Sequence, residues 1–194
     1  MAIHAVHLLS QLDHPDVEPT LLRAFSTWPA HGRGVVAARR ALELRAGPSL
    51  VEPLLAVEDP ARARATTLLL AACGGDDPRI RDRIVALLAK PGFDACVAVA
   101  RWVRRDRDDP ELLAAVQGAF DRLVQRVGDE AFEVGVGEDR DLAGVTSMAQ
   151  LLLAVLERLG DVPVARGEAL TLALVRANAL LRLRVADLED ELSR

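Results

Sequence analysis

Apolar residues recur along the chain at the three- and four-residue spacing of an α-helix, in segments separated by proline-containing turns. Four of these segments carry a single apolar stripe, which is typical of a helix with one buried face. The stripes comprise Val17, Leu21, Leu22 and Phe25; Leu50, Leu54, Leu55 and Val57; Ile80, Ile84, Leu87 and Leu88; and Leu112, Leu113, Val116 and Phe120. Strand-like alternation is nearly absent. The pattern therefore predicts helices throughout.

Three intervening segments have a broader apolar surface. They read GRGVVAARRALELRA, ARARATTLLLAAC and GFDACVAVARWVRR. Apolar residues cover more of the circumference here, as expected of a helix that lies between neighbouring helical units. Each broad segment follows one of the narrow stripes, so the two kinds form pairs.

Two sets of prolines mark the same pairs. Pro29, Pro60 and Pro91 are 31 residues apart, and a second set recurs at nearly the same interval: Pro15, Pro48, Pro78 and Pro110. Proline fits the first turn of a helix because the N–H that it lacks would be unpaired there. Asp77 and Asp109 precede two of these prolines, where a carboxylate caps a helix and complements its dipole.

A period of about 31 residues with two helices per unit predicts a repeat protein. One pair of this size cannot bury its apolar face alone, so consecutive pairs must stack. We therefore expect an all-α fold, an α-solenoid in a single domain over residues 1–194, with regular repeats over about 8–127.

The sequence resembles the HEAT-repeat family, in particular its short variants. The first helices VEPTLLRAF and LVEPLLAV place Pro19 and Pro53 before paired leucines, as in the kinked first helix of that family. EDPARARATTLLLAAC is similar to the family's turn and second helix, with Asp59 before the turn and Arg64 after it. The resemblance implies a right-handed superhelix whose second helices line the concave surface, and an acid–arginine ladder that here is incomplete.

The period breaks after residue 127. The segment 128–146 is glycine-rich and carries the charged run Glu138–Asp141, which predicts an irregular insertion loop, with C-terminal helices over about 147–192. Such insertions emerge on one face of a solenoid, often the binding face. The loop is either a connector or a binding loop. If it is a binding loop, we expect Phe132 and Arg140 to contact the partner. A short hairpin through Phe132–Val134 is a further alternative.

The last segment, about 167–192, predicts one long helix. Its second half narrows to a stripe of Leu181, Val185, Leu188 and Leu192. Terminal repeats need a polar outer face, so this helix either caps the array or pairs with another chain, for example as a homodimer.

The charge and the apolar runs narrow the function classes. A formal net charge of −5 argues against nucleic acid as a partner, because nucleic-acid-binding proteins normally carry a basic surface. The run Thr66–Cys73 is far too short to cross a bilayer, so no membrane segment is expected. The start of the chain does not read as a signal peptide. We expect a cytoplasmic protein.

The sequence shows no catalytic constellation, and no enzyme activity is expected. His4 and His7 share a helix face, but a zinc site needs three or four ligands, so we expect no metal and no cofactor. Cys73 and Cys96 lie on alanine-rich helices without a histidine nearby in sequence, and we interpret them as small core residues. No G-x-S-x-G elbow is present.

Arginines gather on or beside the second helices. They are Arg33, Arg39, Arg40, Arg62, Arg64, Arg101, Arg104 and Arg105. A guanidinium stripe on a concave surface suits an acidic peptide or a phosphorylated ligand, whereas the alternative is pairing with neighbouring acidic residues. The sequence thus predicts a non-catalytic protein–protein interaction scaffold that binds an acidic or extended partner.

Two alternatives follow from the architecture alone. HEAT-like DNA-repair glycosylases need a basic groove and aromatic residues that stack on an exposed base, for which Trp28 and Trp102 are the only indoles. Short HEAT-like repeats also occur in proteins that attach bilin chromophores, but nothing in the sequence marks a bilin pocket.

Overall fold

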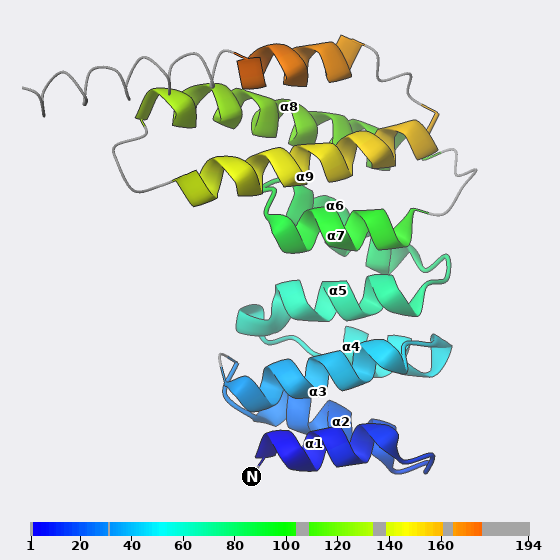
Figure 1. The fold of residues 1–194 in the computed structure, drawn as a ribbon. Coiled ribbons are helices and arrows are strands. Elements are labelled where there is room, and N and C mark those ends of the chain that lie inside the picture. The colour runs from blue at the N-terminus through cyan, green and yellow to red at the C-terminus, as the bar shows by residue number, and fades with distance from the viewer. Residues whose placement is uncertain (1, 31, 104–108, 134–138, 161–164, 176–194) are drawn as a thin grey trace, which may run out of the picture. The chain divides into compact units, whose positions relative to one another are not determined.

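The computed structural model describes residues 2–30, 32–103, 109–133, 139–160 and 165–175. These residues form helices joined by turns, without a strand among them (Figure 1). The all-α class predicted from the sequence is confirmed. Within the described part of the chain, no helix combines the length and the apolar character needed to span a membrane.

The helices follow the predicted segments. Their bounds are α1 Ala2–Gln11, α2 Val17–Thr27, α3 Arg33–Leu44, α4 Val51–Leu55, α5 Ala63–Cys73, α6 Pro78–Leu88, α7 Phe93–Trp102, α8 Pro110–Glu133 and α9 Asp139–Arg158, with 3₁₀ turns η1 at Pro48–Leu50 and η2 at Pro60–Arg62. Residues 165–175 are also helical.

Proline and aspartate set the helix starts as the sequence predicts. Pro78 and Pro110 begin α6 and α8. Asp77 Oδ1 accepts a hydrogen bond of 2.9 Å from the Arg79 N–H, and Asp109 Oδ1 accepts one of 2.9 Å from the Leu112 N–H. Each carboxylate satisfies one of the N–H groups that have no partner at the start of a helix.

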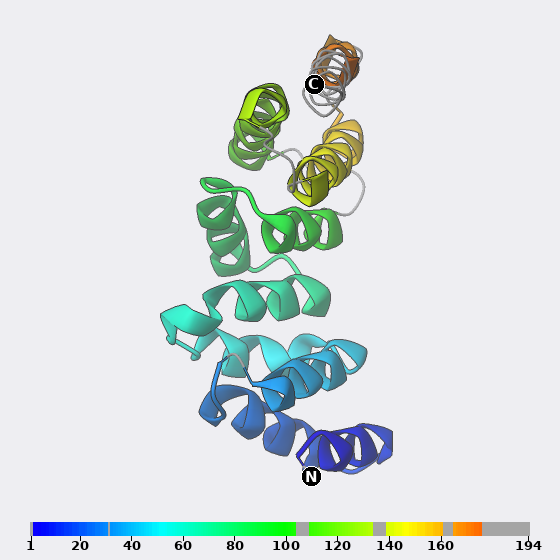
Figure 2. The same ribbon diagram turned by 60° about the vertical axis from the view of Figure 1, so that its left-hand side comes forward.

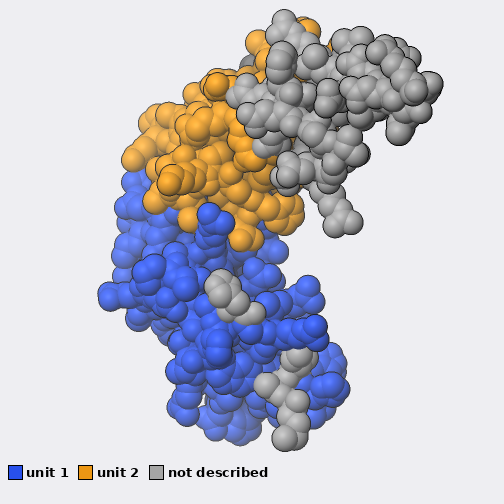
Figure 3. Space-filling model, turned by 90° about the vertical axis from the view of Figure 1, so that its left-hand side faces the viewer, with its two compact units in different colours: residues 1–84, 97–102 blue, residues 85–96, 103–194 orange. Residues whose placement is uncertain are grey.

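The chain divides into two compact units (Figure 3). Unit 1 comprises Met1–Ile84 with Val97–Trp102, and unit 2 comprises Val85–Cys96 with Val103–Arg194. The division falls inside α6 and α7. The single domain expected from the sequence stays a prediction.

Unit 1 is built from helix pairs. α2 packs on α3, α4 packs on α5, and α3 packs on both α1 and α5 (Figures 1 and 2). The predicted stripes and the broader second helices both supply the core. Its fully buried side chains include Leu21, Phe25, Leu50, Leu54, Ile80 and Ile84 from the stripes, and Leu42, Leu69 and Leu70 from α3 and α5. Leu22, Leu55 and Val57 of the stripes are only half-buried. Burial of each fully buried side chain contributes about 1.5–3 kcal/mol.

Unit 2 has its core between α8 and α9, which pack along each other. The buried residues are Leu112, Val116, Phe120, Leu123 and Val127 on α8, and Val145, Ala149, Leu152, Val155 and Leu156 on α9. Both sets recur at intervals of three and four residues, so each helix turns one apolar side to the other.

The insertion loop predicted over 128–146 is largely helical, which corrects the sequence interpretation. α8 continues to Glu133 and α9 already begins at Asp139, so only 134–138 lie outside the described residues. Phe132 and Glu133 belong to α8, which excludes the hairpin proposed for them. The glycines of this segment include Gly128 in α8 and Gly144 in α9, and a glycine costs only about 1 kcal/mol in a helix. Packing between α8 and α9 outweighs that cost.

The C-terminal helix predicted over 167–192 is described only in part. Residues 165–175 are helical, and Leu170 is buried. The amphipathic stripe of its second half lies outside the described residues and stays a prediction.

Gly34 gives a direct test of the packing in unit 1. A Cβ atom at Gly34 would lie 2.7 Å from Cε3 of Trp28. We expect Gly34→Ala to lower the free energy of unfolding by about 1–3 kcal/mol and to shift the fluorescence of Trp28, because the ring must move. Gly144→Ala is the control, since its Cβ meets open space, and helix propensity predicts a gain of up to about 1 kcal/mol. Equal or greater stability of Gly34→Ala would contradict the described contact.

Candidate functional site

Arg62 stands at the start of α5 and is only 6% exposed. Its two Nη groups donate hydrogen bonds to the carbonyl oxygens of Phe25 and Trp28, at the end of α2. Its Nε lies 2.8 Å from Asp59 Oδ2, and its guanidinium carbon lies 5.9 Å from the centre of the Phe25 ring. These contacts leave Arg62 inaccessible to a partner. We assign it a structural role.

Three further arginines make the same kind of contact. Arg45 donates to the carbonyls of Ser10 and Leu12 at the end of α1. Arg83 donates to Leu55 O of α4 at 2.9 Å, and Arg122 donates to Leu88 O of α6 at 2.8 Å. We call Arg45, Arg62, Arg83 and Arg122 the tying arginines. Each satisfies carbonyls that have no partner within their own helix, and its positive charge complements the negative end of the helix dipole.

We expect Arg62→Met to lower the free energy of unfolding by about 3 kcal/mol, because the substitution keeps the aliphatic volume but leaves buried carbonyls without donors. Arg64→Met is the matched control. Arg64 is exposed two residues away, so its loss should change stability by no more than about 0.5 kcal/mol. Urea unfolding followed by circular dichroism measures both. Equal effects of the two substitutions would show that Arg62 does not tie the helices.

Other predicted site residues have different surroundings. Arg101 of α7 donates to Glu43 of α3 at 2.8 Å, which is the internal pairing considered as the alternative in the sequence. Arg104 and Arg105 lie outside the described residues. Phe132 and Arg140 lie in α8 and α9, and their side chains are not described.

Arg79 forms an ion-pair cluster with two carboxylates at the surface. Its guanidinium binds Asp77 at 2.6 Å and also donates to Glu52 of α4. The hydrogen bonds from Arg79 and its charge lower the pKa of both carboxyl groups below their usual range. This cluster connects α4 with the start of α6, and its guanidinium is fully paired with carboxylates, so it presents no free cation to an acidic partner.

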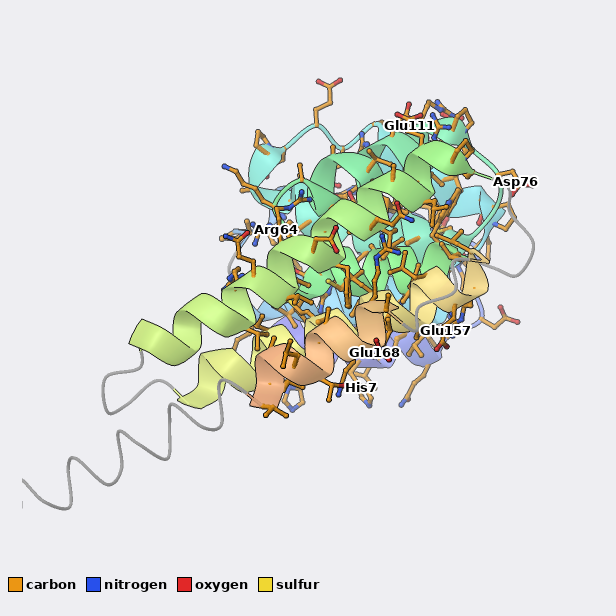
Figure 4. The ribbon with its side chains drawn as sticks, turned by 90° about the horizontal axis from the view of Figure 1, so that it is seen from above. His7, Arg64, Asp76, Glu111, Glu157 and Glu168 are labelled. Carbon is orange, nitrogen blue, oxygen red and sulfur yellow. The ribbon has the colours of Figure 1, made fainter. Side chains whose placement is uncertain are left out.

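Arg33, Arg39 and Arg40 on α3 and Arg64 on α5 contrast with these pairs. In the described part of the chain, none of these four side chains makes a hydrogen bond or an ion pair. Arg33, Arg40 and Arg64 are exposed, and the side chain of Arg64 lies at the outside of the ribbon in Figure 4. Arg39 is half-buried, with an Nε that has no hydrogen-bond partner. We call these four residues the free arginines.

Two of the free arginines line a groove between α1 and α3. Its volume is about 480 Å³. The α1 side is formed by Val6, His7 and Ser10, and the α3 side by Arg33, Val36, Ala37, Arg40, Ala41 and Leu44. Leu44 is 83% exposed and Val36 is 42% exposed. The groove thus combines accessible apolar surface with two unpaired cations. The sequence interpretation included the arginines but not the groove, because α1 precedes the recognised repeats.

The described residues offer no evident catalytic or metal chemistry. No group of three or more histidine, cysteine, aspartate or glutamate side chains among them is placed to hold a metal ion. Cys73 and Cys96 are both buried. Burial raises the pKa of the Cys73 thiol, and it raises the pKa of the Cys96 thiol to about 12. At neutral pH both sulfurs are protonated, which is the less nucleophilic form.

Both thiols should therefore be inert in the folded protein. We expect a disulfide reagent such as dithionitrobenzoate to label neither cysteine at pH 8 over minutes, and to label both at once after denaturation. Mass spectrometry of the labelled protein gives the count. Rapid labelling of Cys96 in the native state would contradict its burial in the core.

Protein-family models, curated proteins and solved structures were all compared with this chain, and none of the three comparisons gave a match.

Proposed function

We propose that the chain is a non-catalytic protein-binding scaffold that recognises an acidic segment of a partner protein. The main observation in support of this proposal is that some arginines are bonded within the chain and others are not. The tying arginines, Arg79 and Arg101 are bonded within the chain, whereas the free arginines on neighbouring helices α3 and α5 have no acidic partner in the described structure. Unpaired guanidinium groups gathered on a protein of net charge −5 favour an acidic ligand.

We further propose that the helix pairs form an α-solenoid of HEAT-like repeats. The pairs α2/α3 and α4/α5 support this architecture, because α3 also packs on α5 of the next pair. The period of about 31 residues supports it as well. Stacked helix pairs of this kind bind partners over an extended surface built from successive repeats.

The glycosylase alternative lacks a supporting observation. Trp102 is 2% exposed, and Trp28 is half-buried with part of its ring against Gly34. Base-stacking enzymes present an accessible aromatic face, which Trp102 does not offer. We therefore favour protein binding over recognition of a nucleic-acid base.

Affinity purification from the native host, with wild-type protein and two charge-reversed variants, tests this function. Arg33→Glu/Arg40→Glu reverses two free arginines, and Arg23→Glu/Lys90→Glu reverses two exposed cations elsewhere. Glutamate at Arg33, the first residue of α3, is compatible with the helix dipole, so folding should be preserved. Circular dichroism checks this.

We expect the wild type and the Arg23/Lys90 variant to retain the same proteins, and the Arg33/Arg40 variant to lose them. The retained proteins should carry acidic segments. A set that is unchanged by the Arg33/Arg40 reversal, or no protein retained by the wild type, would contradict the proposed function.

A further inference from the structure

Helix α3 has two apolar faces. One is buried in unit 1 and includes Val35, Ala38 and Leu42. The other leaves Val36 and Leu44 accessible to solvent, and both belong to the wall of the α1–α3 groove. Single exposed apolar residues are common on protein surfaces and need no explanation. These two differ because one continuous hollow joins them to each other and to Val6 of α1.

The charges around the groove have one sign. Arg33 and Arg40 line it, and no aspartate or glutamate is among its lining residues. Both guanidinium groups are free of internal ion pairs in the described structure. The groove therefore favours a ligand that combines apolar groups with negative charge, because such a ligand contacts the apolar wall and pairs with the two exposed cations at its edge.

The spacing of these residues fits a helix as the ligand. Arg33 and Arg40 are seven residues apart, which corresponds to about 10 Å, or two turns, along α3. Two acidic residues seven positions apart on a partner helix have the same separation. The apolar positions Val36 and Leu44 lie on the same side of α3 as the arginines, so the groove beside α1 accepts the side-chain ridge of a third helix.

We propose that the α1–α3 groove binds one acidic amphipathic helix of a partner protein. Apolar side chains of that helix lie against Val36 and Leu44, and acidic residues two turns apart pair with Arg33 and Arg40. This inference rests on the proposed function and assigns it a place and a ligand class.

A second copy of this chain is a poorer occupant. A twofold contact through this face brings the same patch of both copies together, which sets arginines against arginines. Like charges placed opposite one another at an interface cost several kcal/mol. The charge pattern therefore favours a different, acidic chain.

Selection from a random peptide library displayed on phage, with the wild-type protein as bait, tests the inference. Selected peptides are synthesised and their affinities are measured by fluorescence anisotropy. The protein variants are Leu44→Asp, Arg33→Glu/Arg40→Glu and, as the control, Arg23→Glu/Lys90→Glu. Leu44 is 83% exposed, so its substitution by aspartate leaves the core intact.

We expect selected peptides with apolar residues at helical spacing and acidic residues about seven positions apart. Leu44→Asp and the Arg33/Arg40 reversal should each weaken binding by about tenfold or more, equivalent to about 1.4 kcal/mol, and the control should not. Peptides whose acidic residues are replaced by lysine should lose their affinity for the wild-type protein. The same peptides should bind the Arg33→Glu/Arg40→Glu variant, whose reversed charges complement lysine.

Other outcomes overturn the groove assignment. They are peptides without acidic residues, undiminished binding to Leu44→Asp, no selected peptide, or a wild-type dimer in light scattering that Leu44→Asp dissociates. Affinity purification with Leu44→Asp separates the two proposals. If host proteins are lost on reversal of Arg33 and Arg40 but kept by Leu44→Asp, the protein-binding function stands and the groove assignment fails.

Discussion

The structure depends on how the carbonyl groups at its helix ends are satisfied. The last turn of every helix leaves carbonyls without a partner in that helix, and short helices packed close together have many such ends. In this chain, Arg45, Arg62, Arg83 and Arg122 each donate to the end of another helix. One side chain thereby satisfies backbone acceptors, offsets a helix dipole and fixes the position of one helix against another.

This constraint explains why an arginine-rich, acidic protein presents only a small cationic surface. Most arginines with described side chains are committed to carbonyls or carboxylates within the chain, as Arg62 is to Phe25 and Trp28 and Arg101 is to Glu43. The described arginine side chains without an internal partner are Arg23 of α2 and the free arginines of α3 and α5. The proposed ligand site lies where two of these unpaired arginines, Arg33 and Arg40, line the groove beside α1.

The sequence predicted the helices well where proline and apolar spacing coincide. Pro78 and Pro110 begin helices, and the stripes through Leu21, Ile84 and Leu112 are buried. The loop predicted through Gly128 and Gly144 was wrong, because the packing of α8 on α9 outweighs the weak helix propensity of glycine. The sequence could not tell which arginines are bonded within the chain and which are free. Arg62 and Arg64 are two residues apart, and only the direction in which each side chain leaves the helix start makes one buried and the other exposed.

Tying and free arginines form two distinct populations. Nitrogen-15 NMR of the guanidinium groups measures this difference directly in the unliganded protein, since hydrogen-bonded Nη–H protons exchange slowly with water and exposed ones exchange fast. We expect slow exchange and separate Nη signals for Arg62, and fast exchange with averaged signals for Arg33, Arg40 and Arg64. Equal protection of Arg33, Arg40 and Arg62 would contradict this difference.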